Sequence, residues 1–207
     1  MITILGITIK CYTMNKIKKI IKETIENFIN EEFTDEILGI IDECLNDLNE
    51  YVQPFGLSVA FNKNYPFRGY SAEFLAVYQV RSVASGQIKL GINLPYLKAC
   101  MAENNIPISE LKEQINISVW HEVGHGLVEF IKRLRRRATQ NGSDLFTREM
   151  KKDFKYITSN EEEAVEEFGA MQEGYAYYSD LDDFISRYEE NLIGMLSLKS
   201  VQTSNFK

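Results

Sequence analysis

Histidine and cysteine are both scarce in this chain, and their scarcity limits the metal sites that it can build. The 207 residues include two histidines and three cysteines. A catalytic zinc site normally takes three protein ligands, so a site made of histidines alone is excluded. The cysteines Cys11, Cys44 and Cys100 are widely spaced and form no C-x-x-C pair. We therefore expect a reducing, cytoplasmic compartment rather than a disulfide framework.

The chain also lacks long apolar runs and an excess of basic residues. No stretch approaches the roughly 20 apolar residues that a membrane-spanning helix needs. Residues 1–9 alternate as in a strand and lack the basic start of a signal peptide, so we expect neither secretion nor membrane insertion. The net charge of -7 disfavours nucleic acid and anionic membrane surfaces as partners.

The hydrophobic content of 44% can form one core, and we expect a single α+β domain over residues 1–207. Thr34 is the expected start of the second helix. Gly124 and Gly126 weaken the long helix, which is expected where another element or a substrate approaches closely. The predicted segments are N-terminal helices (14–53), a small mixed or antiparallel sheet ending in a hairpin (57–94), a long helix (109–136) and a last set of helices (159–198).

Both histidines fall in one short pattern within the long helix. They stand four positions apart, as His121 and His125, and Glu122 directly follows the first. Residues four apart on a helix share a face, so the two imidazoles can bind one metal ion, with Glu122 beside them. A lone histidine is more often an ordinary core residue, but this H-E-x-x-H pattern favours a metal site.

A third ligand is expected from the acidic helix that residues 158–170 predict. Glu162 and Glu166 lie one turn apart and so share a face. One of them can bind the metal while the other accepts a hydrogen bond from a ligand imidazole.

Other assignments of the third ligand stay open. Glu161 and Glu163 are neighbouring candidates, and Cys100 is a further one. The acidic turn also has a purely structural explanation, because Ser159 and Glu162 have the spacing of a capping box and acidic residues suit a helix N-terminus.

The two motifs together resemble the gluzincin metallopeptidases, which include thermolysin and small single-domain minigluzincins. The second motif and its position after His125 are similar to those of compact ImmA/IrrE-like members. The resemblance implies a zincin-like fold with one Zn²⁺ ion, and it gives Glu162 the ligand place and Glu166 the place of the family's aspartate. Val165 departs from the usual alanine. The resemblance is confined to these motifs and the helix that carries the first.

The resemblance also implies a peptide or protein substrate, which zincins pair with a strand near the active-site helix. Ile88–Asn93 or a neighbouring strand is the expected partner, although lining the core is its alternative role. Tyr175, Tyr177 and Tyr178 are candidate stabilisers of an oxyanion, although aromatic clusters are more often core. Thr139–Asp153 is expected to be a loop, and either it or the C-terminal tail can be autoinhibitory.

The sequence thus predicts a zinc-dependent endopeptidase that hydrolyses peptide bonds with metal-activated water and with Glu122 as the general base. Two alternatives remain. The first is a zinc-binding regulatory or protein-interaction module with little peptidase activity, and the second is a helical protein with a chance motif. The sequence leaves cleavage preference and oligomeric state open.

Overall fold

The structure is a computed structural model, and it describes residues 31–62, 76–78, 86–94 and 108–198. The expected strand at residues 1–9, the first N-terminal helix, Cys11, Cys100 and the C-terminal tail lie outside these residues. The elements are α2 (Glu31–Val52), η1 (Gln53–Phe55), β1 (Ser58–Asn62), β2 (Ala76–Tyr78), β3 (Gln87–Ile92), α4 (Ile108–Gln140), α5 (Arg148–Ser159), α6 (Glu161–Met171), α7 (Asp180–Arg187) and α8 (Glu189–Leu196).

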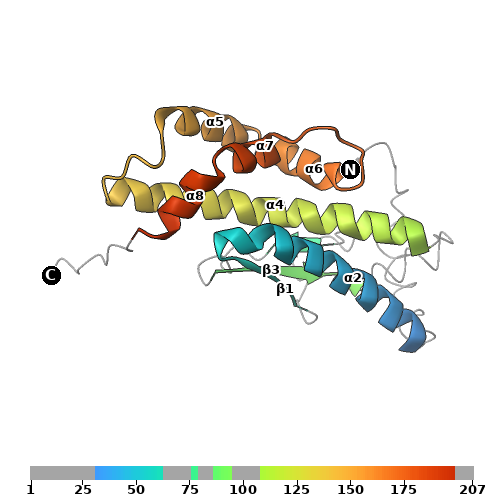
Figure 1. The fold of residues 1–207 in the computed structure, drawn as a ribbon. Helices are drawn as coiled ribbons and strands as arrows, with labels where there is room; N and C mark the ends of the chain where they lie inside the picture. The colour runs from blue at the N-terminus through green and yellow to red at the C-terminus, as the bar shows by residue number, and fades with distance from the viewer. Residues whose placement is uncertain (1–30, 63–75, 79–85, 95–107, 199–207) are drawn as a thin grey trace, which may run out of the picture.

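The long helix α4 is the element around which the others pack. Figure 1 shows α5, α6 and α7 on one side of α4, and α2 and the sheet on the other. Its apolar residues therefore recur on more than one face, and eight of them are at most 1% exposed: Leu111, Ile115, Val119, Val123, Leu127, Val128, Ile131 and Ala138. Within the described residues, no helix has both the length and the hydropathy that crossing a membrane requires.

The sheet has three described strands in the order β1-β3-β2. β1 runs parallel to β3, and β2 runs antiparallel to it, so the sheet is mixed and the expected pairing of the last two strands is confirmed. The α+β class is confirmed with it. β3 has a neighbour on both sides, so Ile88–Asn93 is excluded as the partner of a substrate strand and only a neighbouring strand remains. Ile88, Leu90 and Ile92 are buried, as the alternative role of lining the core predicts.

A side chain of α2 covers the outer edge of β1 at one residue, Val59. The carboxamide of Asn49 accepts a hydrogen bond from the amide of Val59 over 2.8 Å and donates one to the carbonyl oxygen of Val59 over 3.2 Å. Asn49 thus satisfies both backbone groups that a further strand would pair with at this position.

The expected loop over Thr139–Asp153 is helical at both ends, and residues 141–147 between them form the connection. α4 continues to Gln140, and α5 begins at Arg148. The hydroxyl of Thr147 caps α5 by accepting a hydrogen bond from the amide of Met150. The helix forms because three apolar residues recur on one face and are buried: Met150, Phe154 and Ile157. The expected loop is therefore confirmed for residues 141–147 and wrong for the residues on either side of them.

Two expected helix starts are also wrong. Thr34 lies inside α2 rather than at its start. Ser159 does not cap the glutamate helix, because α5 runs up to it and its hydroxyl donates to the carbonyl of Lys155. Asn160 alone separates α5 from α6, and it makes no side-chain capping bond.

Candidate metal centre

The site is built where α6 crosses α4 at close range. A Cβ atom on Gly124 would lie 3.0 Å from a methyl carbon of Val165, and one on Gly169 would lie 3.1 Å from the amide nitrogen of His121. Later residues of α6 face earlier residues of α4, so the two helices run antiparallel. Glycine at these contacts lets the helices approach, which confirms the expected close approach at Gly124.

The opposite face of α4 meets the sheet in the same way. A Cβ atom on Gly126 would lie 2.9 Å from a methyl carbon of Ile88 on β3. α4 is therefore held between α6 and the sheet along the H-E-x-x-H turn.

Three aromatic rings fix this crossing. Tyr51 of α2, Trp120 of α4 and Phe168 of α6 pack edge to face, with all three centroid separations between 5.4 and 5.6 Å. The hydroxyl of Tyr51 donates to a carboxylate oxygen of Asp182 on α7 over 2.7 Å. The three rings and Asp182 connect α2, α4, α6 and α7 next to His121. Aromatic pairs of this geometry stabilise the fold by more than their buried area alone.

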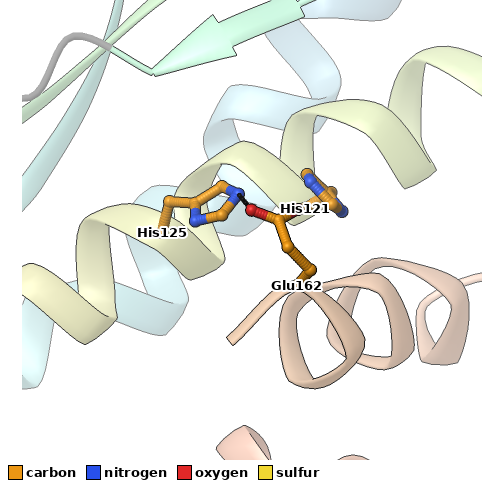
Figure 2. Close-up of side chains that lie close together, drawn as sticks. All are labelled: His121, His125 and Glu162. Carbon is orange, nitrogen blue, oxygen red and sulfur yellow. Dashed lines mark ion pairs between the residues drawn. The ribbon is translucent and has the colours of Figure 1, made fainter. Parts of the chain in front are cut away.

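The structure brings together the three residues that the sequence assigns to the metal. One ligand atom each from His121, His125 and Glu162 lies within 4.8 Å of the others. Figure 2 shows both imidazoles on α4 and the Glu162 carboxylate reaching from α6 towards His125, whose Nε2 atom lies 3.9 Å from Oε1. We call these residues the His-His-Glu cluster.

The cluster has the donors that a catalytic zinc ion prefers. Two imidazole nitrogens and one carboxylate oxygen form a known three-ligand set that leaves a position for water. Ligand atoms around tetrahedral zinc stand about 3.3 Å apart, so the cluster needs a small contraction. The Glu162 side chain is 85% exposed and free to rotate, so the residues present fit the ion.

His121 is held in the form that binds metal. Burial lowers the pKa of its imidazole to about 4, and the nearby His125 acts in the same direction. The ring is therefore neutral near pH 7 and keeps a lone pair for a metal ion without first losing a proton.

Glu161, rather than Glu166, contacts the imidazole of His125. Oε1 of Glu161 lies 3.2 Å from Nδ1 of His125, and Oε2 accepts a hydrogen bond from Nζ of Lys132 over 2.9 Å. Burial favours the neutral carboxyl, but the bonds from Lys132 and His125 outweigh it and lower the pKa of Glu161. Glu166 is exposed, so the structure does not place it in the role expected of it.

The remaining acidic residues have different positions. Glu163 is exposed and does not belong to the His-His-Glu cluster. Glu122 is half-buried and interacts within the fold. Because Glu161, Glu162 and Glu163 form the first turn of α6, the positive end of the helix dipole favours their charge.

The three tyrosines do not lie beside the cluster. They follow the C-terminal end of α6, whereas Glu162 lies in its first turn, and an 11-residue helix is about 16 Å long. The end of α6 that precedes the tyrosines lies against a part of α4 before His121, because Glu173 accepts a hydrogen bond from Asn116 over 2.5 Å. Their side chains are at least half exposed: Tyr175 51%, Tyr177 102% and Tyr178 53%. The structure thus gives no support to an oxyanion role for them.

Lys132 is the residue that sequence reasoning missed. It lies seven positions after His125, which is two helical turns on the same face of α4. That spacing was a usable signal, but its partner comes from α6 and depends on how the helices cross.

No family model, no curated protein and no solved structure matches this chain. The interpretation of the site therefore depends on its geometry and on the two sequence motifs.

Proposed function

We propose that the protein is a zinc-dependent endopeptidase with a zincin-like fold of the gluzincin type. The observation that carries the proposal is the His-His-Glu cluster, in which two ligands come from an H-E-x-x-H turn and the third from a separate helix. An acidic first turn occurs in many helices, but its approach to a histidine pair favours metal binding.

His121, His125 and Glu162 would hold the ion. Bound zinc supplies a Lewis acid that polarises a carbonyl group and lowers the pKa of water. Glu122 follows the first ligand directly and is not part of the cluster. In this proposal its carboxylate takes a proton from the attacking water and passes it to the leaving amine. Glu161 keeps His125 oriented, and the buried setting of His121 keeps that imidazole unprotonated.

An extended peptide would pair with β2 in this proposal. The edge of β1 is occupied by Asn49, and β3 is paired on both sides. β2 has one neighbour, β3, among the described strands, and it packs against α4. Strand addition there would bring a substrate backbone alongside the helix that carries the histidines.

Two measurements on the full chain test the proposal. Purified protein dialysed against zinc should hold one ion per chain, and anomalous scattering at the zinc edge should locate it between His121, His125 and Glu162. A library of unstructured peptides should then be cut by the zinc-loaded protein, and a chelator should stop the cutting. Absence of zinc overturns the proposal. One bound ion without any cutting favours the regulatory or protein-interaction module instead.

A further inference from the structure

Lys132, Glu161 and His125 form a continuous chain of polar contacts from α4 to α6 and back to α4. The carboxylate of Glu161 uses one oxygen for each partner, with Oε2 on Nζ of Lys132 at 2.9 Å and Oε1 on Nδ1 of His125 at 3.2 Å. The side chains of Lys132 and Glu161 are about one-third exposed or less, at 32% and 28%. Water therefore competes less with this ion pair than with one at a fully exposed surface.

The direction of the contact with His125 follows from the ion pair. A carboxylate paired with an ammonium group is ionised and can only accept hydrogen bonds. Nδ1 of His125 therefore carries the hydrogen, and the lone pair of the neutral ring lies on Nε2. This is the atom that faces Glu162 across 3.9 Å in Figure 2.

Glu161 and Glu162 are adjacent, and both belong to the first turn of α6. Either carboxylate has the chemistry of a metal ligand. The ammonium group of Lys132 is what distinguishes them, because it holds Glu161 on the Nδ1 side of the ring while Glu162 extends to the Nε2 side.

We propose that Lys132 and Glu161 are positioning residues that fix the tautomer of His125 and keep Glu161 out of the ligand place that Glu162 takes. The tautomer of His125 follows from these contacts alone. The statement about ligand choice rests on the proposed function, because it requires that the cluster binds zinc.

The chain offers a matched control one residue away. Arg133 forms an ion pair with Glu129 over 3.2 Å, with exposed fractions of 36% and 22%. This pair resembles the Lys132–Glu161 pair in charge and exposure, but it lies within α4 and does not touch His125. Lys132→Met and Arg133→Met each remove one positive charge from the same helical turn, so effects of net charge are equal in the two variants.

The tautomer is measured on the metal-free protein. The chain has two histidines, so a long-range ¹H–¹⁵N correlation spectrum without an added tag contains two imidazoles, and a His121→Gln variant assigns them. We expect His125 to carry its hydrogen on Nδ1 in the wild type and in Arg133→Met. Glu161→Ala should shift it towards Nε2, whereas Glu161→Gln keeps an acceptor oxygen and should retain the wild-type state. A wild-type His125 protonated on Nε2, or an unchanged spectrum in Glu161→Ala, overturns the proposal.

Ligand choice is measured by zinc affinity in competition with a chromophoric chelator. Loss of a residue that orients a metal ligand typically weakens affinity about 10–100-fold, and we expect this of Lys132→Met and Glu161→Ala. Arg133→Met should stay within about twofold, as for an ordinary exposed ion pair, and Lys132→Arg should restore most of the affinity. Equal dissociation constants for Lys132→Met and Arg133→Met overturn the positioning role but leave the proposed function standing. A wild-type protein that binds no zinc removes the proposed function and the ligand-choice statement with it, and the tautomer spectrum then decides the rest.

Discussion

Gly169 of α6 lies directly against the backbone of α4, so that a Cβ atom at this position would be 2.6 Å from the carbonyl oxygen of Ile117. No side chain can rotate away to relieve that contact, because the opposing atom belongs to a helical backbone. Ile117 lies one turn before His121. The absence of a side chain at Gly169 therefore sets the separation of the two helices that carry the His-His-Glu cluster.

Gly169→Ala is expected to push α6 away from α4. Overpacking of this kind typically costs about 1–3 kcal/mol of unfolding free energy, and the displacement should also weaken zinc binding without any change to a ligand. Urea unfolding and chelator competition measure the two effects. Gly39→Ala is the control, because Gly39 is exposed on α2 with open space around it, and alanine there should stabilise by up to about 1 kcal/mol. Unchanged zinc affinity in Gly169→Ala would show that the helix separation does not control the site.

Glu162→Gln and Glu163→Gln distinguish the proposed ligand from its neighbour. Both substitutions remove one charge from the first turn of α6, but only Glu162 belongs to the His-His-Glu cluster. Glu162→Gln should weaken zinc binding by at least about 10-fold, since an amide oxygen is a poorer zinc ligand than a carboxylate. Glu163→Gln should bind zinc as the wild type does. The same chelator titration compares the two, and equal losses would mean that charge rather than ligation is being measured.

Local patterns in the sequence were enough to place the two histidines. A spacing of four on a predicted helix puts His121 and His125 on one face, and both rings lie there, 5.1 Å apart between centroids. Glu162 was assigned through the resemblance to a known motif, and in the structure its carboxylate lies beside the two histidines. The partner of Glu161 could not be predicted, because its pairing with Lys132 depends on the crossing angle of two helices far apart in the sequence.

The same distinction explains the errors in the fold. The strands were predictable from alternating residues, but their order was not, because pairing is a non-local property; β3 therefore proved to be central rather than an edge. α5 was missed for another reason. Its signal was present in the Thr147 cap and in the spacing of Met150 and Phe154, but the polar residues around them outweighed it.

The pKa of His121 predicts a loss of stability in acid for the metal-free protein. The folded-state pKa is about 4 and the ordinary value is 6.5. Between these values the unfolded chain binds a proton that the folded chain does not, so the unfolding free energy falls as the pH falls through this range. At pH 4.5 the expected loss is about 2–3 kcal/mol.

Urea unfolding of the wild type and of His121→Gln at pH 7.5, 6 and 4.5 measures this loss. Carboxylates titrate in both proteins, so the difference between the two isolates the histidine. The variant should become more stable relative to the wild type as the pH falls. Parallel dependence on pH in the two proteins would mean that His121 titrates alike in the folded and unfolded chains.

Asn49→Leu is expected to destabilise the fold through the edge of β1. The substitution leaves the amide and carbonyl of Val59, which is 6% exposed, without the partner that Asn49 provides, at a cost of about 2–4 kcal/mol. Asn160→Leu is the matched control. The carboxamide of Asn160, like that of Asn49, donates a hydrogen bond to the carbonyl oxygen four residues earlier, but it does not bond to a strand. Its loss should therefore cost less than about 1 kcal/mol of unfolding free energy. Equal midpoints of thermal unfolding for the two variants would contradict the role given to Asn49.

Glu122→Gln and His125→Ala distinguish catalysis from metal binding. In the proposed mechanism Glu122 transfers protons but does not hold the ion. Glu122→Gln should therefore retain one zinc per chain while peptide cleavage falls by about 10²–10⁴-fold, the usual contribution of a general base. His125→Ala removes a ligand and should lose both zinc and cleavage. Zinc content by elemental analysis and cleavage of one library-derived peptide, measured on the same preparations, give the two readouts. Cleavage at the wild-type rate by Glu122→Gln would remove Glu122 from the mechanism, whereas loss of zinc from that variant would make Glu122 part of the metal site instead.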